Sequence, residues 1–217
     1  MKKEGFSIRI VLLLAIICVS CEKELQKELF SDLVTFSDLG TFIDSRDGQE
    51  YQMVEIGDQV WMKENLNYTA DSGNWIYDND PANASIYGRL YNWETACEVC
   101  PDGWHLPSDD EWTILSDYAG GDLRAGSAMR EEGNVHWEPF WKEGTNESGF
   151  TALPGGFAVP SSKGDDFGGL GGEAHFWSST EGSASTAWDR WMGNKFHFLN
   201  RFDRPKVQGV SVRCIKN

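Results

Sequence analysis

Two thiols separated by two residues, at Cys97 and Cys100, are the side chains with the clearest chemical potential in this sequence. Such a pair serves either as a redox couple or as half of a zinc site. A four-thiolate zinc site needs a second pair, which Cys214 cannot supply alone. A thioredoxin-like couple begins a helix, whereas this pair follows a predicted helix and precedes a Pro-Asp-Gly turn. Neither chemistry is therefore favoured.

Other residue types that build catalytic or metal sites occur without the required spacing. The glycine-rich stretch 164–172 lacks the lysine of a phosphate-binding loop and the ligand spacing of an EF-hand. No Gly-x-Ser-x-Gly motif of a hydrolase occurs. We expect no catalytic set and no cofactor, and calcium held by Asp165 and Asp166 stays an alternative that no motif supports. The histidines are isolated and are interpreted as packed or solvated residues: His105, His136, His175 and His197.

The segment 133–146 combines three aromatic residues with no helical or strand period. Loops on a rigid scaffold often carry function, and aromatic faces beside carboxylates suit saccharide rings, which present apolar C–H faces together with hydroxyl groups. The sequence therefore predicts a glycan site on the loops 133–146 and 161–173. In the alternative interpretation, the three aromatic residues fill a small core beneath the loop. The predicted ligand-binding residues are Trp137, Phe140, Trp141, Asp165 and Asp166.

The N-terminus has the pattern of an export signal. Three basic residues precede the short apolar run 10–17, and small residues follow it. The run is too short for a membrane-spanning helix, which needs about 20 apolar residues. Residues 1–20 are therefore predicted to be a signal peptide, and the segment 18–21 is similar to a lipobox whose Cys21 is lipidated. The alternative is an ordinary cleaved signal that happens to precede a cysteine.

The charge of the mature chain is strongly negative. Three basic residues and one acidic residue leave with residues 1–20, so 16 basic and 33 acidic residues remain, with a net charge of −17. Such a field repels phosphate backbones, whose binding depends on neutralisation by Lys and Arg. The predicted partners are therefore a membrane, through the lipid anchor, and an extracellular ligand, with nucleic acid excluded.

The remaining chain is predicted to form one domain over residues 41–217. Roughly 175 residues suffice for a single core and are short for two. Residues 21–40 are charged and polar, and we interpret them as the lipidated N-terminus and a tether. A short amphipathic helix is the alternative there, because leucines recur every four residues.

The first elements of the domain are predicted to form an antiparallel β-meander over residues 42–62. A turn at Asp47-Gly48 and a second at Gly57-Asp58 separate its strands. The polar segment 71–88 has no sustained period and is predicted to be a long surface loop. Closing strands are expected towards the C-terminus.

Two helices are predicted in the middle of the domain, over 87–97 and 109–119. The second begins with a capping box, in which Ser108 and Glu111 satisfy each other's backbone N–H groups, and it ends at Gly120. The residues predicted to face inward are Leu90, Trp93 and Ala96 in the first helix and Trp112, Leu115 and Tyr118 in the second. Among the tryptophans, a core role is predicted for Trp61, Trp93, Trp104, Trp112 and Trp177, whereas Trp188 and Trp191 are left open between core and binding.

Six segments, in this order, resemble the Fibrobacter succinogenes major paralogous domain over residues 41–217. The resemblance implies a domain of exported proteins and lipoproteins without an established enzymatic activity. The segments are 56–68, 87–93, 100–108, 146–156, 176–180 and 211–214.

The segments 104–112 and 212–214 also resemble parts of the C-type-lectin-like fold of formylglycine-generating enzymes. Together with the elements above, this resemblance implies an α+β fold. The predicted fold class is C-type-lectin-like, with N-terminal β-hairpins, two central helices, a long loop-rich region and closing antiparallel strands.

A disulfide between Cys100 and Cys214 is expected, because export leads to compartments where disulfides persist and both cysteines lie in segments that carry the resemblance. Cys97 would then be unpaired. The alternatives are a bond from Cys97 to Cys214 and a strained ring between Cys97 and Cys100.

We expect a lipoprotein of the outer membrane, facing the periplasm or the cell surface, that acts as a non-catalytic binding or adhesion module for glycans. The alternatives are an enzyme of the formylglycine-generating type and a purely structural envelope protein. A cleft with free thiols close together would favour the enzyme.

Overall fold

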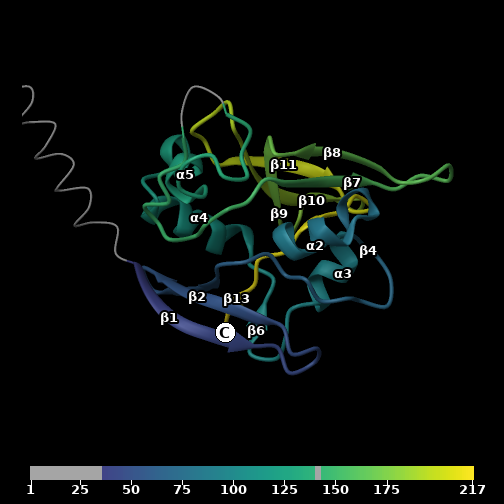
Figure 1. The fold of residues 1–217 in the computed structure, drawn as a ribbon, viewed down its shortest axis with the longest axis horizontal. Coiled ribbons are helices and arrows are strands. Elements are labelled where there is room, and N and C mark those ends of the chain that lie inside the picture. Colours follow the sequence, from purple (N-terminus) through teal and green to yellow (C-terminus); the bar gives the residue numbers. More distant parts are fainter. Residues whose placement is uncertain (1–35, 140–142) are drawn as a thin grey trace, which may run out of the picture. The chain divides into compact units, whose positions relative to one another are not determined.

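The protein is described by a computed structural model that covers residues 36–139 and 143–217. The fold is α+β, and strands dominate it (Figure 1). Within these two ranges there are three sheets and four α-helices. The α+β prediction is confirmed, and the prediction of two central helices is too low. None of the helices in these ranges is long and apolar enough to cross a membrane.

The first sheet contains β1 (Phe36–Ile43), β2 (Glu50–Ile56), β3 (Gln59–Met62), β6 (Trp104–His105) and β13 (Ile215–Lys216). Its strand order is β1-β2-β3-β13-β6. The first three strands form the antiparallel meander that the sequence predicts. Both turns fall at the expected glycines, since Gly48 and Gly57 take φ angles of 78° and 60°, which residues with a Cβ rarely adopt. Strand β1 begins earlier than the predicted domain start at Thr41.

The second sheet contains β4 (Asn74–Trp75), β5 (Leu90–Tyr91), β9 (Glu173–Glu181), β10 (Thr186–Gly193), β11 (Asn200–Pro205) and β12 (Val210–Ser211). Its order is β11-β10-β9-β12-β5-β4. Strands β9, β10 and β11 are the closing antiparallel strands that the sequence predicts. A separate hairpin of β7 (Gly155–Val159) and β8 (Asp166–Leu170) packs against β9.

The helices are α2 (Pro81–Tyr87), α3 (Trp93–Glu98), α4 (Asp109–Tyr118) and α5 (Asp122–Met129). The capping box that begins α4 is present, and Trp112 and Leu115 are buried as predicted. Helix α3 starts at Trp93 because the Asn92 side chain accepts the Thr95 backbone N–H. Leu90 therefore belongs to a strand and not to the predicted helical stripe.

The prediction of an irregular loop over residues 71–88 is wrong. This segment holds β4, a 3₁₀ turn at Tyr77–Asn79 and helix α2. The helix forms because Asp80 accepts the Ala82 backbone N–H and Pro81 occupies the first helical position, where its missing N–H costs nothing.

The C-terminal segment ties the first sheet together. Strand β13 pairs with both β3 and β6, and the predicted disulfide joins Cys100 to Cys214 across a sequence separation of 114. Arg213, which precedes Cys214, is fully buried. It donates to Asn65 Oδ1 and to the Phe150 carbonyl at 2.7 Å each. Burial lowers the pKa of Arg213 to about 9, so the guanidinium stays charged at neutral pH and is satisfied by neutral acceptors.

Candidate functional site

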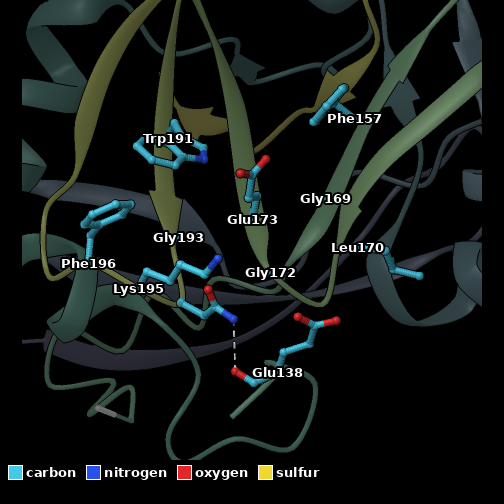
Figure 2. Close-up of a pocket in the computed structure, with 11 residues that line it drawn as sticks. Glu138, Phe157, Gly169, Leu170, Gly172, Glu173, Trp191, Gly193, Lys195 and Phe196 are labelled. Carbon is cyan, nitrogen blue, oxygen red and sulfur yellow. Dashed lines mark hydrogen bonds between the residues drawn. The ribbon is translucent and has the colours of Figure 1, made fainter. Parts of the chain in front are cut away.

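A pocket of about 480 Å³ opens beside the ends of strands β9 and β10 (Figure 2). Strand β9 begins here, β10 ends here, and the β7–β8 hairpin lies alongside. Among the described residues, the pocket is lined by Glu138, Phe157, Gly169, Leu170, Gly172, Glu173, Trp191, Gly193, Asn194, Lys195 and Phe196.

Aromatic rings form one side of this pocket. Trp191, on β10, meets the edge of Phe196 with ring centroids 5.8 Å apart. Phe196 stacks in turn on Phe198 at 5.5 Å, and both phenylalanines are more than one third exposed. Phe157 reaches the pocket from the β7–β8 hairpin. Exposed aromatic faces of this kind offer apolar contact area that the core does not use.

Polar groups complete the rim, and backbone hydrogen bonds hold it together. Glu138 donates its backbone N–H to the Gly171 carbonyl at 2.7 Å, and Asn194 donates its own to the Gly172 carbonyl at 2.9 Å. The Asn194 amide also donates to the Glu138 carbonyl at 3.2 Å. Gly171 has a φ of 77°, which favours glycine. Loop 133–139, the β8–β9 turn and the segment after β10 are thus joined around one cavity.

A chain of four polar residues runs inward from the pocket, and we refer to Glu173, His175, Asp189 and Arg204 as the pocket network. His175 Nε2 lies 3.3 Å from Glu173 Oε2, and His175 Nδ1 lies 2.9 Å from Asp189 Oδ2. Arg204 donates from Nε to Asp189 Oδ2 at 2.6 Å. The side-chain exposure falls from 39% at Glu173 to 5% at His175 and 0% at Asp189. The network therefore connects solvent with a buried carboxylate.

Electrostatics keep Glu173 ionised. The hydrogen bond from His175 lowers the pKa of Glu173 more than burial raises it, and the positive charges of Arg204 and Lys195 lower it further. The imidazole is itself fixed between rings, with Trp191 stacked at 6.1 Å and Phe157 edge-on at 5.5 Å. The carboxylate at the rim of the pocket is thus an ionised, oriented hydrogen-bond acceptor.

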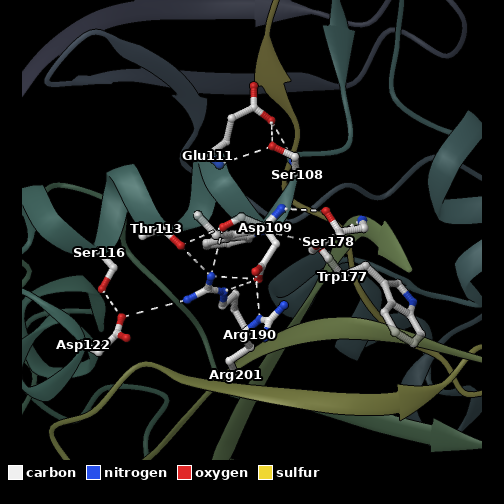
Figure 3. A network of polar contacts seen from close by, with 12 residues as sticks. Ser108, Asp109, Glu111, Thr113, Ser116, Asp122, Trp177, Ser178, Arg190 and Arg201 are labelled. Atoms are coloured by element: carbon white, nitrogen blue, oxygen red, sulfur yellow. Dashed lines mark hydrogen bonds and ion pairs between the residues drawn. The ribbon is translucent and has the colours of Figure 1, made fainter. Parts of the chain in front are cut away.

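A second group of charges lies on the opposite face of β10, and we refer to Asp109, Thr113, Arg190 and Arg201 as the α4 network (Figure 3). Arg190 donates to Asp109 Oδ1 at 2.8 Å and to Thr113 Oγ1 at 2.9 Å. Arg201 reaches the other Asp109 oxygen at 2.8 Å and lies 3.4 Å over the Trp188 ring. This network fastens α4 to the sheet.

Of the predicted ligand-binding residues, the structure describes Trp137, Asp165 and Asp166, and it does not bring these three together. Trp137 is 2% exposed, and its Nε1 donates to the Ala152 carbonyl at 3.0 Å, so its ring packs in the core and does not face a ligand. Asp165 and Asp166 are exposed at the turn end of the β7–β8 hairpin, where Asp166 pairs with Val159, and they do not line the pocket. Phe140 and Trp141 lie outside the described residues.

The predicted loops nevertheless contribute to the pocket through other residues. Glu138 follows the buried Trp137, and Glu173 closes the predicted loop 161–173. The sequence analysis did not predict Phe157 and Phe196 as pocket residues, and it left Trp191 open between a core and a binding role. The alternation of Trp188 and Trp191 in a strand places them on opposite faces, but only the partner elements reveal which face borders a cavity.

The remaining reactive residues are dispersed. Cys97 is exposed and unpaired, and partial burial raises the pKa of its thiol to about 11, which leaves little thiolate at neutral pH. His105 and His136 each contact a single carboxylate, Glu111 and Glu131. Across residues 36–139 and 143–217, no three His, Cys, Asp or Glu side chains converge as metal ligands would.

The family profile of the Fibrobacter succinogenes major domain matches residues 54–216. The chain therefore belongs to this family. No curated protein and no solved structure matches the chain.

Proposed function

We propose that this protein is a non-catalytic binding module and that it binds a saccharide in the pocket at the ends of β9 and β10. The observation that carries the proposal is the juxtaposition of half-exposed rings with an oriented carboxylate. Trp191 and Phe196 offer faces for the C–H side of a sugar ring, while Glu173 accepts hydrogen bonds from hydroxyl groups. Few, well-placed polar groups on an aromatic wall are typical of small-molecule sites.

Variants of two tryptophans on one strand test this proposal. Trp191→Ala removes the pocket wall, whereas Trp188→Ala removes a comparable ring from the opposite face of β10, where it stacks on Arg201. We expect the wild type to be retained on at least one immobilised polysaccharide, Trp191→Ala to lose that retention, and Trp188→Ala to keep it. Equal retention of all three proteins would contradict the proposed pocket.

An enzyme of the formylglycine-generating type is the second candidate, suggested by the resemblance in segments 104–112 and 212–214. Against it, Cys214 is consumed in a disulfide with Cys100, and Cys97 is the one free cysteine in the described part of the chain. A thiol chemistry that needs two cysteines in one cleft has no support in this geometry. Counting free thiols in the folded, unreduced protein with a chromogenic disulfide reagent tests this point.

The C-type-lectin-like description of the fold remains a proposal as well. It is supported by the way the two ends of the domain meet, since β13 joins the sheet of β1, β2 and β3 and the disulfide closes the chain near its C-terminus. Such a closure would leave the intervening loops free to bind ligands.

We propose further that the protein is an exported lipoprotein anchored in the outer membrane through Cys21, a residue outside the described ranges. The support is the sequence of residues 1–21. Cys21→Ala should remain unprocessed or be released from the membrane fraction, and Cys18→Ala is the matched control that keeps the lipidated residue. Normal membrane retention of Cys21→Ala would contradict the anchor, and protease accessibility on intact cells would separate a surface from a periplasmic location.

A further inference from the structure

We infer that Glu173 determines which saccharides the pocket accepts, with His175 as the residue that positions it, so that the ligand is an uncharged or amine-bearing sugar and not a uronic acid. This inference rests on the proposed saccharide-binding function. It adds the chemical class of the ligand and the residues that select it.

The Glu173 carboxylate lies among the residues that line the pocket. Glu173 and His175 are two residues apart on β9, so their side chains share one face of the sheet. Figure 2 shows the Glu173 carboxylate pointing between Trp191 and Phe157. A Cβ at Gly169 would lie 2.9 Å from Glu173 Oε2, so the glycine leaves the room that the carboxylate occupies. The acceptor therefore has a built position at the aromatic wall.

The two oxygens of the Glu173 carboxylate differ in their contacts. Oε2 is engaged by His175 Nε2 at 3.3 Å. No hydrogen bond to Oε1 is present among the described residues, although an ionised carboxylate accepts several. A ligand hydroxyl or ammonium group can therefore donate to Oε1 while the imidazole fixes the rest of the side chain.

The charged groups around the pocket also influence which ligand it accepts. Among the described lining residues, the rim carries two carboxylates, Glu138 and Glu173, and one ammonium group, Lys195. Behind it, the charge of Asp189 is balanced by that of Arg204. The remaining negative charge repels a ligand carboxylate. Two ionised carboxylates also cannot form a hydrogen bond with each other, because neither carries a donor proton. Like charges brought together in a binding site discriminate against the wrong ligand.

The contacts around His175 favour one tautomer of its imidazole, because an arginine donor lies beside Nδ1. The groups that face it are Glu173 on β9, Asp189 on β10 and Arg204 on β11, together with the uncharged rings of Trp191 and Phe157. A neutral imidazole can accept from Arg204 Nη2, 2.8 Å from Nδ1, and donate through Nε2. In this tautomer the imidazole holds the Glu173 carboxylate through Nε2.

Titration calorimetry with the purified full-length chain tests the selection. The probes are three β-1,4-linked oligosaccharides of equal length, built from glucosamine, glucose and glucuronic acid. We expect the wild type to bind the first two and to reject the third. Glu173→Gln should weaken binding of the accepted probes by roughly tenfold, the loss of one hydrogen bond to a charged acceptor, and should reduce the discrimination against the uronic acid.

The positioning role of His175 is tested without any ligand, by following the Glu173 carboxyl signal in an NMR pH titration of the free protein. His175→Gln keeps an amide donor near the position of Nε2, whereas His175→Leu removes it. We expect the Glu173 pKa to stay near its wild-type value in His175→Gln and to rise in His175→Leu. If His175→Leu does not fold, His175→Asn, whose amide is too short to reach Glu173, takes its place.

The outcomes separate the two proposals. Binding that depends on Trp191 but is unchanged in Glu173→Gln, with the uronic acid accepted as well as glucose, would overturn this inference and leave the saccharide pocket standing. An unchanged Glu173 pKa after removal of the imidazole donor would overturn the positioning role of His175. A wild-type protein that binds none of the three probes, and no immobilised polysaccharide, would overturn both proposals.

Discussion

Asp189 and Arg190 are consecutive residues of β10, yet they belong to two networks on opposite faces of one sheet. Arg190 is 2% exposed and joins the α4 network, which helix α4 covers. Asp189 is fully buried and joins the pocket network, which leads outward to Glu173. Both networks pair a buried charge with an opposite charge, as an interior requires. They differ in their outermost carboxylate, because Glu173 of the pocket network is 39% exposed whereas Asp109 of the α4 network is 13% exposed.

This difference separates a network that joins elements of the fold from a network that borders the proposed binding pocket. In the α4 network, Asp109 is held by two arginines from different strands, and every contact joins elements of the fold. In the pocket network, the last carboxylate faces a cavity, and one of its oxygens has no hydrogen bond within the described residues. A buried ion pair is weak proof of net stabilisation, but its disruption is costly because a charge is left unpaired. Loss of the α4 network should therefore affect stability, and changes at the rim of the pocket should affect binding.

The largest expected effect is that of Arg190→Ala. It would leave Asp109, whose side chain is 13% exposed, with Arg201 alone and would open a cavity beneath α4. We expect the free energy of unfolding in urea to fall by about 3 to 5 kcal/mol. Arg201→Ala is the matched control, because Arg201 is 42% exposed and exposed pairs contribute about 1 kcal/mol or less. Equal losses in both variants would remove the distinction between the buried and the exposed arginine.

A smaller effect is expected from Ser108→Ala, which removes the cap that precedes Asp109 in α4. The Ser108 hydroxyl accepts the Glu111 backbone N–H at 3.2 Å, and loss of such a cap typically costs about 1 kcal/mol. Urea unfolding of this variant, compared with the exposed control Ser179→Ala, measures the cost. A loss as small as that of the control would show that the Ser108 cap does not contribute measurably to stability.

Glu173→Gln should change stability less than either of these variants. Its side chain is 39% exposed, and the amide keeps an oxygen that accepts from His175. We expect a change within about 0.5 kcal/mol, as for most surface substitutions, measured by urea unfolding at neutral pH without ligand. A loss comparable to that of Arg190→Ala would mean that the pocket network fastens the fold, and the contrast between the two faces would fail.

The smallest effect is a pH dependence. The pKa of Glu173 is lowered from its ordinary value of 4.5, mainly by the hydrogen bond from His175. A carboxyl with a lowered folded pKa stabilises the protein above its unfolded pKa, and this contribution is lost as the pH falls through the folded value. As the pH falls from about 5 to 3, the free energy of unfolding measured in urea should therefore decrease less in Glu173→Gln than in the wild type. Identical profiles would contradict an ionised, hydrogen-bonded Glu173.

The comparison also shows where prediction from the sequence succeeds. The capping box of α4, the turns of the meander and the buried Trp112 follow from local rules of hydrogen bonding and φ preference, and each is present. The loop prediction for the long segment 71–88 failed because one of its turn-forming residues, Asp80, also caps a short helix. Local composition cannot distinguish a turn from a helix start when the same residues suit both.

The pocket depends on contacts between distant segments. Trp137 and Trp191 both lie beside polar residues in the sequence, yet the first is buried against the core and the second borders a cavity. Trp137 donates from Nε1 to the Ala152 carbonyl, whereas Trp191 stacks on His175, whose ring is contacted by Phe157 of the β7–β8 hairpin. No local pattern encodes these partners.

The sequence by itself determined the family over residues 54–216, the α+β class and the meander, because these follow from local periodicity, turn chemistry and recurrent motifs. It favoured the pairing of Cys100 with Cys214 over two alternatives, and the structure has that pairing. Only the tertiary structure decided which carboxylate lines the pocket. Glu173, His175, Asp189 and Arg204 come from three strands, and strand pairing brings them together across as many as 31 residues of chain. Charge pairing and exposure arise from that packing, which no single segment specifies.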